Sequence, residues 1–137
     1  MEIKTAAAAL AALAQETRLA IFRLLVEAGP DGMAAGRIGA ILRVPGATLS
    51  FHLKELAGAA LISARQEKQF IYYTVDFERM AALMGFLTQN CCRGMPQACL
   101  TAVTSELARC APRAKAKARA GRSRAVKTPA ARLLRRS

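Results

Sequence analysis

The side chains with the most evident chemistry are four cysteines near the end of the chain, all within 20 residues of one another. Cys91 and Cys92 are adjacent, Cys99 follows seven positions after the second, and Cys110 comes later. Thiolates are soft ligands, and they prefer thiophilic ions to magnesium or calcium. The cluster therefore raises the question of a soft-ion site.

The number of sulfurs decides which ion would fit. Three thiolates suit a trigonal-pyramidal ion such as As(III) or Sb(III), whose lone pair occupies the remaining direction, whereas tetrahedral Zn(II) wants four ligands. Gly94 and Pro96 break the segment and let the chain fold back. Three other interpretations stay open: packing of small apolar thiols, a strained vicinal disulfide, and structural zinc held by all four cysteines.

The elements before this cluster can be read from apolar spacing. Residues 5–14 are rich in Ala and Leu, and residues 15–28 repeat apolar positions at helical spacing before the Gly29–Gly32 stop. A short helix fits 34–42, with Ile38, Ile41 and Leu42 on one face. Further predicted elements are a helix over 46–57, strands over 61–65 and 70–75, and a last helix capped by Asp76.

Two helices joined by a short turn and followed by a hairpin predict a winged helix-turn-helix. The fold class is α+β, mainly α, in the order ααααββα. In the helix 46–57, Leu49, Leu53 and Leu56 form a buried stripe. His52 lies beside this stripe, where a hydrogen bond is expected rather than metal ligation. Phe51 points outward, and it either contacts a thymine methyl or packs locally.

Three separated segments resemble the ArsR/SmtB family of metal-responsive repressors. They are LAQETRLAIFRLL (13–25), RIGAILRVPGATLSFHLKELAGAALI (37–62) and ARQEKQFIYYTVD (64–76). Family members carry a similar L-A-x-x-T-R-L segment, an S/T-L-S-x-H-L-K-x-L recognition helix and a Y-Y-containing second wing strand. The resemblance covers residues 5–100.

The chain departs from the family pattern at three positions. Pro45 replaces a common capping Ser, Phe51 replaces a common His, and Lys68 replaces the usual glycine of the wing tip. The first two changes put the DNA sequence preference in doubt, and the third implies a different turn.

The resemblance implies a homodimeric transcriptional repressor that binds double-stranded operator DNA and is not an enzyme. The first and last helices are expected to form the dimer interface. Residues expected at the DNA are Ala47, Thr48, Ser50, Phe51 and Lys54 on the recognition helix, with Arg65 and Lys68 in the hairpin.

Two sites used elsewhere in the family lack their ligands here. There are no cysteines around Ala34 and Gly36, and His52 is the only histidine. The CC-then-C arrangement instead resembles the arsenite-responsive branch, which implies that Cys91, Cys92 and Cys99 bind As(III) or Sb(III) as inducer, with Cys110 as the alternative third ligand. No organic cofactor is expected.

The positive charge is concentrated at the end of the chain. Residues 1–110 carry 11 Lys/Arg and 9 Asp/Glu, whereas residues 111–137 carry 10 Lys/Arg and no acid. We expect a domain over 1–100, which includes the cysteine site at its end, and an Ala/Lys/Arg-rich tail over 101–137. The tail lacks the apolar residues for a core and is expected to be disordered when free. It serves either as a solubilising extension or as a phosphate-neutralising arm on DNA.

The N-terminal apolar segment bears on the cellular compartment of the protein. The segment AAAALAALA resembles a signal peptide, but MEIK before it has no net positive charge. No apolar window reaches the roughly 18 to 20 residues of a membrane span, so a cytoplasmic protein with reduced thiols and no membrane partner is expected. Two rival functions are a thiol redox-sensing regulator of the same fold and a DNA-coating protein without sequence preference.

Overall fold

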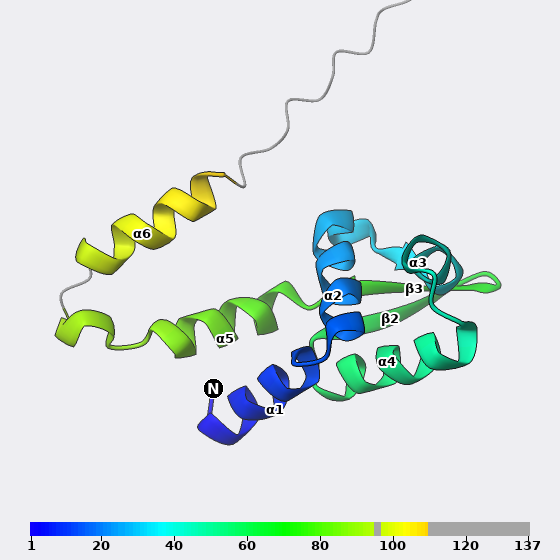
Figure 1. Cartoon of the computed structure of the whole chain (residues 1–137), viewed down its shortest axis with the longest axis horizontal. Coiled ribbons are helices and arrows are strands. Elements are labelled where there is room, and N and C mark those ends of the chain that lie inside the picture. The colour runs from blue at the N-terminus through cyan, green and yellow to red at the C-terminus, as the bar shows by residue number, and fades with distance from the viewer. Residues whose placement is uncertain (95–96, 110–137) are drawn as a thin grey trace, which may run out of the picture. The chain divides into compact units, whose positions relative to one another are not determined.

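The computed structural model describes residues 1–94 and 97–109 of the chain. The chain divides into two compact units, Met1–Gly94 and Met95–Ser137. The first unit combines helices with a small antiparallel sheet (Figure 1). No helix in the described part of the chain is both long and apolar enough to cross a membrane.

Two N-terminal helices, α1 (Ile3–Leu13) and α2 (Glu16–Ala28), supply five of the thirteen buried residues of the core cluster. The helix α2 begins where the Gln15 side chain accepts a hydrogen bond of 2.8 Å from the backbone N–H of Arg18, which satisfies a donor that the first turn leaves open. It ends at Gly29, whose φ of 72° and ψ of −157° lie in a region reserved for glycine. Ile21 and Leu25 of α2 are fully buried.

The predicted helix-turn-helix is present as α3 (Ala35–Leu42) and α4 (Gly46–Gly58). Both helices contact α2 and each other. The predicted stripe of Leu49, Leu53 and Leu56 on α4 is buried, which confirms the interpretation of the spacing. The predicted face of α3 is partly wrong, because Ile38 is fully buried whereas Ile41 is 48% exposed.

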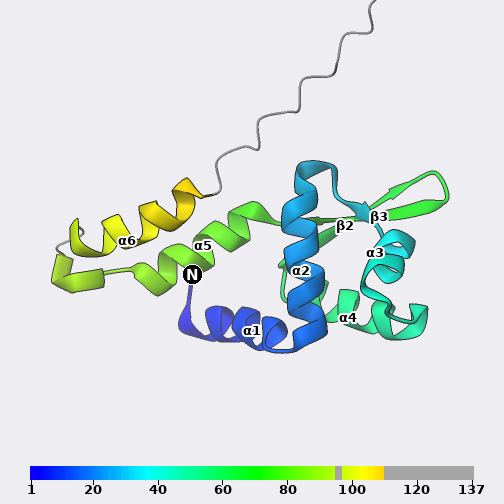
Figure 2. The ribbon, with the colours of Figure 1, turned by 45° about the horizontal axis from the view of Figure 1, so that its top comes forward.

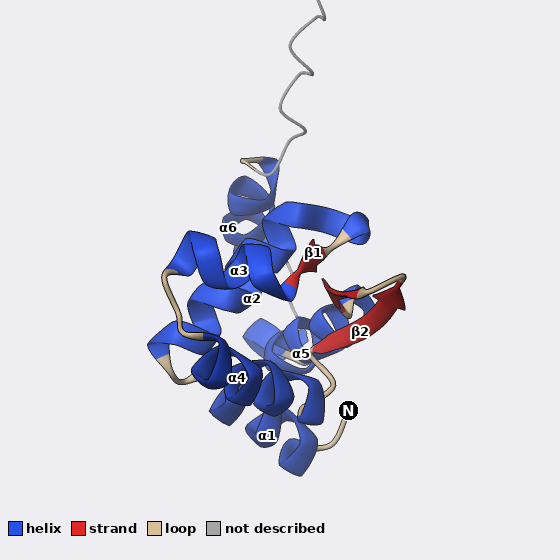
Figure 3. Cartoon of the chain, turned by 90° about the vertical axis from the view of Figure 1, so that its right-hand side faces the viewer, coloured by secondary structure: helices blue, strands red, loops and turns tan. Residues whose placement is uncertain are grey.

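A hairpin of β2 (Ile62–Glu67) and β3 (Phe70–Val75) forms the wing. Its antiparallel register runs from Ile62 opposite Val75 to Glu67 opposite Phe70. A further strand, β1 (Met33–Ala34), is labelled in Figure 3. It pairs with the other edge of β3, so that the sheet order is β1-β3-β2. The predicted element order lacked this strand, because two residues are too short to show an alternating pattern.

Gly32 explains how the chain reaches β3. The residue follows the 3₁₀ turn η1 (Gly29–Asp31) and has a φ of 69°. A Cβ atom at this position would collide with the carbonyl oxygen of Tyr73 and with Cγ2 of Thr74. Glycine therefore permits both the backbone conformation and the close approach to β3.

The last helix of the first unit is α5 (Phe77–Thr88). The Asp76 side chain accepts a hydrogen bond of 2.9 Å from the backbone N–H of Arg79, which confirms the predicted cap. Leu83 is buried in the core, and α5 contacts α1. The short turn η2 (Cys91–Gly94) follows and ends the unit.

The second unit contains the helix α6 (Gln97–Ala108). This helix was not predicted, since Gly94 and Pro96 suggested a broken segment that continues into the tail. It begins directly after this break and includes Cys99. The predicted tail from residue 110 onward lies outside the described residues.

Candidate DNA-binding surface and cysteine site

The face of α4 opposite the buried stripe is open to solvent. The five side chains predicted to read DNA are all exposed: Ala47, Thr48, Ser50, Phe51 and Lys54. A recognition helix needs such a face, because base edges in the major groove are reached by side chains on one side of the helix. The structure thus presents these residues as predicted, and their contact with DNA stays a prediction.

Phe51 and His52 occupy different environments on α4. The Phe51 side chain is 56% exposed, and its ring meets the His52 ring edge-on at 5.7 Å between centroids. His52 is buried, and its Nδ1 atom has no hydrogen-bond partner within the described part of the chain. The hydrogen bond expected for this histidine is therefore not found at Nδ1.

The wing tip is tighter than the sequence suggested. Lys68 and Gln69 alone connect the strands, because Glu67 and Phe70 are already paired. Lys68 has a left-handed backbone with a φ of 57°, a conformation that favours glycine and that costs an ordinary side chain about 1 kcal/mol. The exposed Lys68 side chain stands at this tip.

Arg65 is engaged within the wing. Its guanidinium lies 3.5 Å from the Glu67 carboxylate and 5.8 Å from the centre of the Tyr72 ring. It also donates a hydrogen bond of 3.5 Å to the backbone carbonyl of Asp31. These exposed contacts are weak, so Arg65 can exchange the Glu67 carboxylate for a phosphate at little cost.

Positive charge collects on the helix-turn-helix and wing. Residues 35–75 carry five cations and two acids, whereas the remainder of residues 1–94 carries five cations and six acids. Figures 1 and 2 show α3, the start of α4 and the wing tip at the same end of the first unit. This end is suited to a polyanion.

Two cations on this end were absent from the predicted set. Arg37 is exposed on α3, and Arg43 is exposed at its C-terminus with a left-handed φ of 55°. The first helix of a helix-turn-helix crosses the DNA backbone, so a helical wheel of residues 35–42 would have drawn attention to Arg37. No sequence pattern indicated the left-handed conformation of Arg43.

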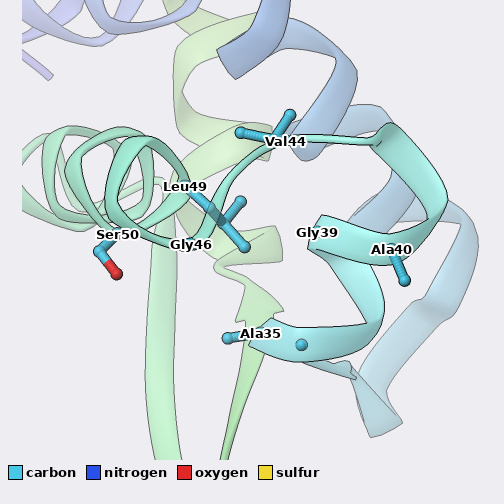
Figure 4. Close-up of a pocket in the computed structure, with 8 residues that line it drawn as sticks. Ala35, Gly39, Ala40, Val44, Gly46, Leu49 and Ser50 are labelled. Carbon is cyan, nitrogen blue, oxygen red and sulfur yellow. The ribbon is translucent and has the colours of Figure 1, made fainter.

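A hollow of about 430 Å³ lies between α3 and the first turn of α4 (Figure 4). It is lined mostly by small residues: Ala35, Gly36, Gly39, Ala40, Val44, Gly46, Leu49 and Ser50. Ser50 supplies the sole polar side chain of this lining, whereas small-molecule sites combine several converging polar groups. The hollow is lined by small residues because the two helices approach each other closely at Gly39, where an added Cβ would lie 3.2 Å from Leu49 Cδ2.

Cys91 and Cys92 lie in η2, immediately after α5. Their Sγ atoms are 3.5 Å apart, which is longer than the S–S bond of about 2.05 Å, so the two do not form a vicinal disulfide. Cys92 and Arg93 both have left-handed backbones with a φ of 55°. This reversal, rather than a continued helix, brings the two neighbouring sulfurs to one side.

The oxidation state differs from the expectation at one position. Cys92 is disulfide-bonded in the structure, which differs from the expected reduced thiol. The side chain of Cys99 and the whole of Cys110 lie outside what the structure describes. Within the described residues no three His, Cys, Asp or Glu side chains gather as a metal site, so the three-cysteine site stays a prediction.

Apolar side chains on α1 and α5 remain uncovered in the single chain. The exposed ones are Ile3 and Leu10 on α1, and Phe77, Met84 and Leu87 on α5. Monomeric proteins rarely leave such residues in contiguous patches. The two helices contact each other, so their apolar surface is suited to a second copy of the chain.

A helix-turn-helix domain model matches residues 13–63, which include α2, α3 and α4. No curated protein matches the chain in a sequence search. Solved structures do match, and three of them are informative for the surfaces described above.

Reduced HlyU from Vibrio cholerae is 30% identical to the chain, with a TM-score of 0.50 over 65% of this chain and 90% of that one. A homodimeric winged helix-turn-helix DNA-binding domain from Mycobacterium bovis, a possible ArsR-family regulator, is 28% identical, with a TM-score of 0.52 over 66% and 83%. A possible transcriptional regulator for arsenical resistance is 26% identical, with a TM-score of 0.50 over 58% and 79%.

Proposed function

Because the chain belongs to the ArsR/SmtB family of winged-helix transcriptional regulators, we propose that it is a metalloid-responsive repressor. The dimer binds operator DNA through α4 and the wing, and it leaves the DNA when As(III) or Sb(III) binds Cys91, Cys92 and Cys99. The observation that carries this proposal is the pair of neighbouring sulfurs at the end of α5.

The geometry of this pair supports a shared ion once the Cys92 disulfide is reduced. Two sulfurs 3.5 Å apart would subtend about 100° at an ion bonded to both at ~2.3 Å, the length of a zinc–thiolate bond. Such an S–ion–S angle suits a trigonal-pyramidal ion whose coordination is completed by a third sulfur. The similarity to a possible regulator for arsenical resistance favours the same ligand class.

Homodimerisation follows from the uncovered apolar surface of α1 and α5, and the homodimeric M. bovis domain is consistent with it. Two recognition helices would then read half-sites about one turn of DNA apart. Closing an ion site directly after α5 acts on the dimer interface, because α5 contacts α1. A coupling of about 1–3 kcal/mol between the two sites releases the DNA, and operator DNA must weaken metalloid binding by the same factor.

The proposal is tested by fluorescence anisotropy of the reduced protein on operator DNA selected from a random pool. Arsenite should release the wild-type protein, whereas Cys91→Ser, Cys92→Ser and Cys99→Ser should each stay bound at that concentration. Cys110→Ser is the matched control and should respond like the wild type. If Cys110→Ser fails to respond and Cys99→Ser responds, Cys110 is the third ligand; release of all four variants would exclude the site.

A redox-sensing function is the second candidate, and the Cys92 disulfide favours it. In this case the disulfide itself changes operator affinity, and metalloid is not required. One of the similar structures is HlyU in its reduced form, so the thiol state has been distinguished for a protein of this fold. Titrating operator complexes with mild peroxide and then with a thiol reductant, without arsenite, separates the two functions, since only a redox sensor cycles under these conditions.

A further inference from the structure

We propose that Phe70 is an apolar wedge that enters the minor groove beside each half-site and makes the regulator prefer deformable base steps there. This inference rests on the proposed binding of operator DNA. It concerns flanking positions that α4 does not reach, and it is independent of the ion or redox signal.

The aromatic side chain of Phe70 is exposed at the tip of the wing. Its side chain is 52% exposed and does not belong to the core cluster of the first unit. It is the first residue of β3 and directly follows the two-residue tip. A large apolar side chain at the outermost pair of a projecting hairpin is suited to insertion between the surfaces of a partner.

The tip holds Phe70 in a defined position. The pairing of Glu67 with Phe70 closes the ladder directly at the turn, and Lys68 takes the left-handed conformation that so short a turn requires. Strand alternation puts Phe70 and Tyr72 on one face of the hairpin and Ile71 on the other. Phe70 is therefore a rigid projection rather than a residue on a flexible loop.

The charges beside Phe70 indicate nucleic acid as the partner. Lys68 lies at the tip, and Arg65 lies over Tyr72 on the Phe70 face. The one acid on this face, Glu67 opposite Phe70, is neutralised by its ion pair of 3.5 Å with Arg65. The helix-turn-helix and wing together carry the net positive charge of the first unit, with five cations against two acids. Proteins that bind the minor groove commonly combine such cations with a Phe, Leu or Ile wedge that partly unstacks one base step.

An inserted side chain selects DNA sequences by how easily the base step at the insertion point can be deformed. Pyrimidine–purine steps such as TA are kinked easily, whereas A-tracts are stiff. Insertion of Phe70 should therefore favour operators with a TA step at one fixed distance outside each half-site. We expect about tenfold tighter binding than to the same operator with an A-tract there, which is a typical effect for one unfavourable position.

The test uses the full-length reduced chain and duplexes that share one operator core, with a TA step moved through the flanks or replaced by an A-tract. The wild type should show the flank preference, Phe70→Ala should lose it, and Phe70→Leu should keep most of it. A 2-aminopurine base at the preferred step should brighten on binding wild type but not Phe70→Ala, because unstacking relieves its quenching.

Ile71→Ala is the matched control, since Ile71 is 45% exposed on the opposite face of the same hairpin. It should retain the preference and the fluorescence change. A flank preference that survives in Phe70→Ala, is absent from the wild type, or is lost only in Ile71→Ala would overturn the assignment. Loss of core recognition by the wild type would instead refute the proposed function, so the two failures are distinguishable.

Discussion

Single residues decide where the backbone of this chain can go. Gly29 and Gly32 both have positive φ with ψ near −160°, yet only Gly32 approaches β3 so closely that a Cβ would collide with it. Lys68 also has a left-handed backbone, with a φ of 57°. A substitution at Gly29 or Lys68 therefore tests the free-energy cost of the backbone conformation alone. A substitution at Gly32 adds the cost of the steric contact with β3.

Gly32→Ala should therefore destabilise the protein more than Gly29→Ala does. Both substitutions force alanine into a glycine region at about 1–3 kcal/mol, but Gly32→Ala must also displace the Tyr73 carbonyl and with it the β1–β3 pairing. Urea unfolding at one fixed protein concentration, which keeps dimerisation equal, measures the difference. Equal losses for the two variants would mean that β3 yields freely at this point.

Lys68→Asn should separate backbone strain from phosphate binding. Asparagine tolerates the left-handed conformation better than lysine, so stability should stay equal or rise slightly. If Lys68 contacts a phosphate, the slope of log K against log salt should become shallower by about 0.9. Lys4→Asn on α1 is the control and should keep the wild-type slope. A wild-type slope in Lys68→Asn as well would exclude a contact between the Lys68 side chain and a DNA phosphate.

At the scale of elements, the helix-turn-helix depends on how closely α3 approaches α4. Gly39 is the contact point, because an added Cβ would lie 3.2 Å from both Leu49 Cδ2 and the Val44 carbonyl oxygen. Leu49 belongs to the buried stripe that holds the recognition helix. The contact between Gly39 of α3 and Leu49 of α4 thus determines how the exposed face of α4 is oriented.

Gly39→Val should push α3 and α4 apart. Overpacking of this kind costs about 1–3 kcal/mol, and operator affinity should fall further than stability alone explains, because the α4 face is re-aimed. Gly36→Ala on the same helix meets open space and should stabilise by about 0.5–1 kcal/mol with unchanged affinity. Thermal unfolding and anisotropy on the same samples compare the two; unaltered operator affinity in a folded Gly39→Val protein would contradict this expectation.

At the scale of the whole molecule, charge is divided between a nearly neutral body and a strongly basic end. The last 27 residues hold ten of the 21 cations and no acid. If this end neutralises DNA phosphates, it raises affinity for every sequence without selecting one. The folded first unit would then supply the specificity.

Truncation after Cys110 should flatten the salt dependence of operator binding by several units of slope, because several phosphate contacts are lost together. The preference for operator over random DNA should change little. Anisotropy titrations between about 50 and 200 mM salt, the range in which such slopes are commonly resolved, measure both quantities. An unchanged slope would assign the tail to solubility alone.

The sequence alone was sufficient for elements whose own residues carry the signal. Leu49, Leu53 and Leu56 mark the buried side of α4 by helical spacing, and Asp76 marks the start of α5 by its capping oxygen. The winged helix-turn-helix followed from their order. Of the site, the exposed face of α4 and the adjacent cysteines were recognisable, because each is a property of consecutive residues.

Only the tertiary structure decided features that depend on a neighbour from elsewhere in the chain. The strand β1 exists because the free edge of β3 offers hydrogen bonds to Met33 and Ala34, and two residues carry no pattern of their own. Ile41 stays exposed because α3 turns Ile38 and Leu42, four residues apart, toward the core, and Ile41 lies off this stripe. The 3.5 Å separation of the Cys91 and Cys92 sulfurs likewise depends on a local left-handed turn, since sequence spacing fixes which residues are adjacent but not where their side chains meet.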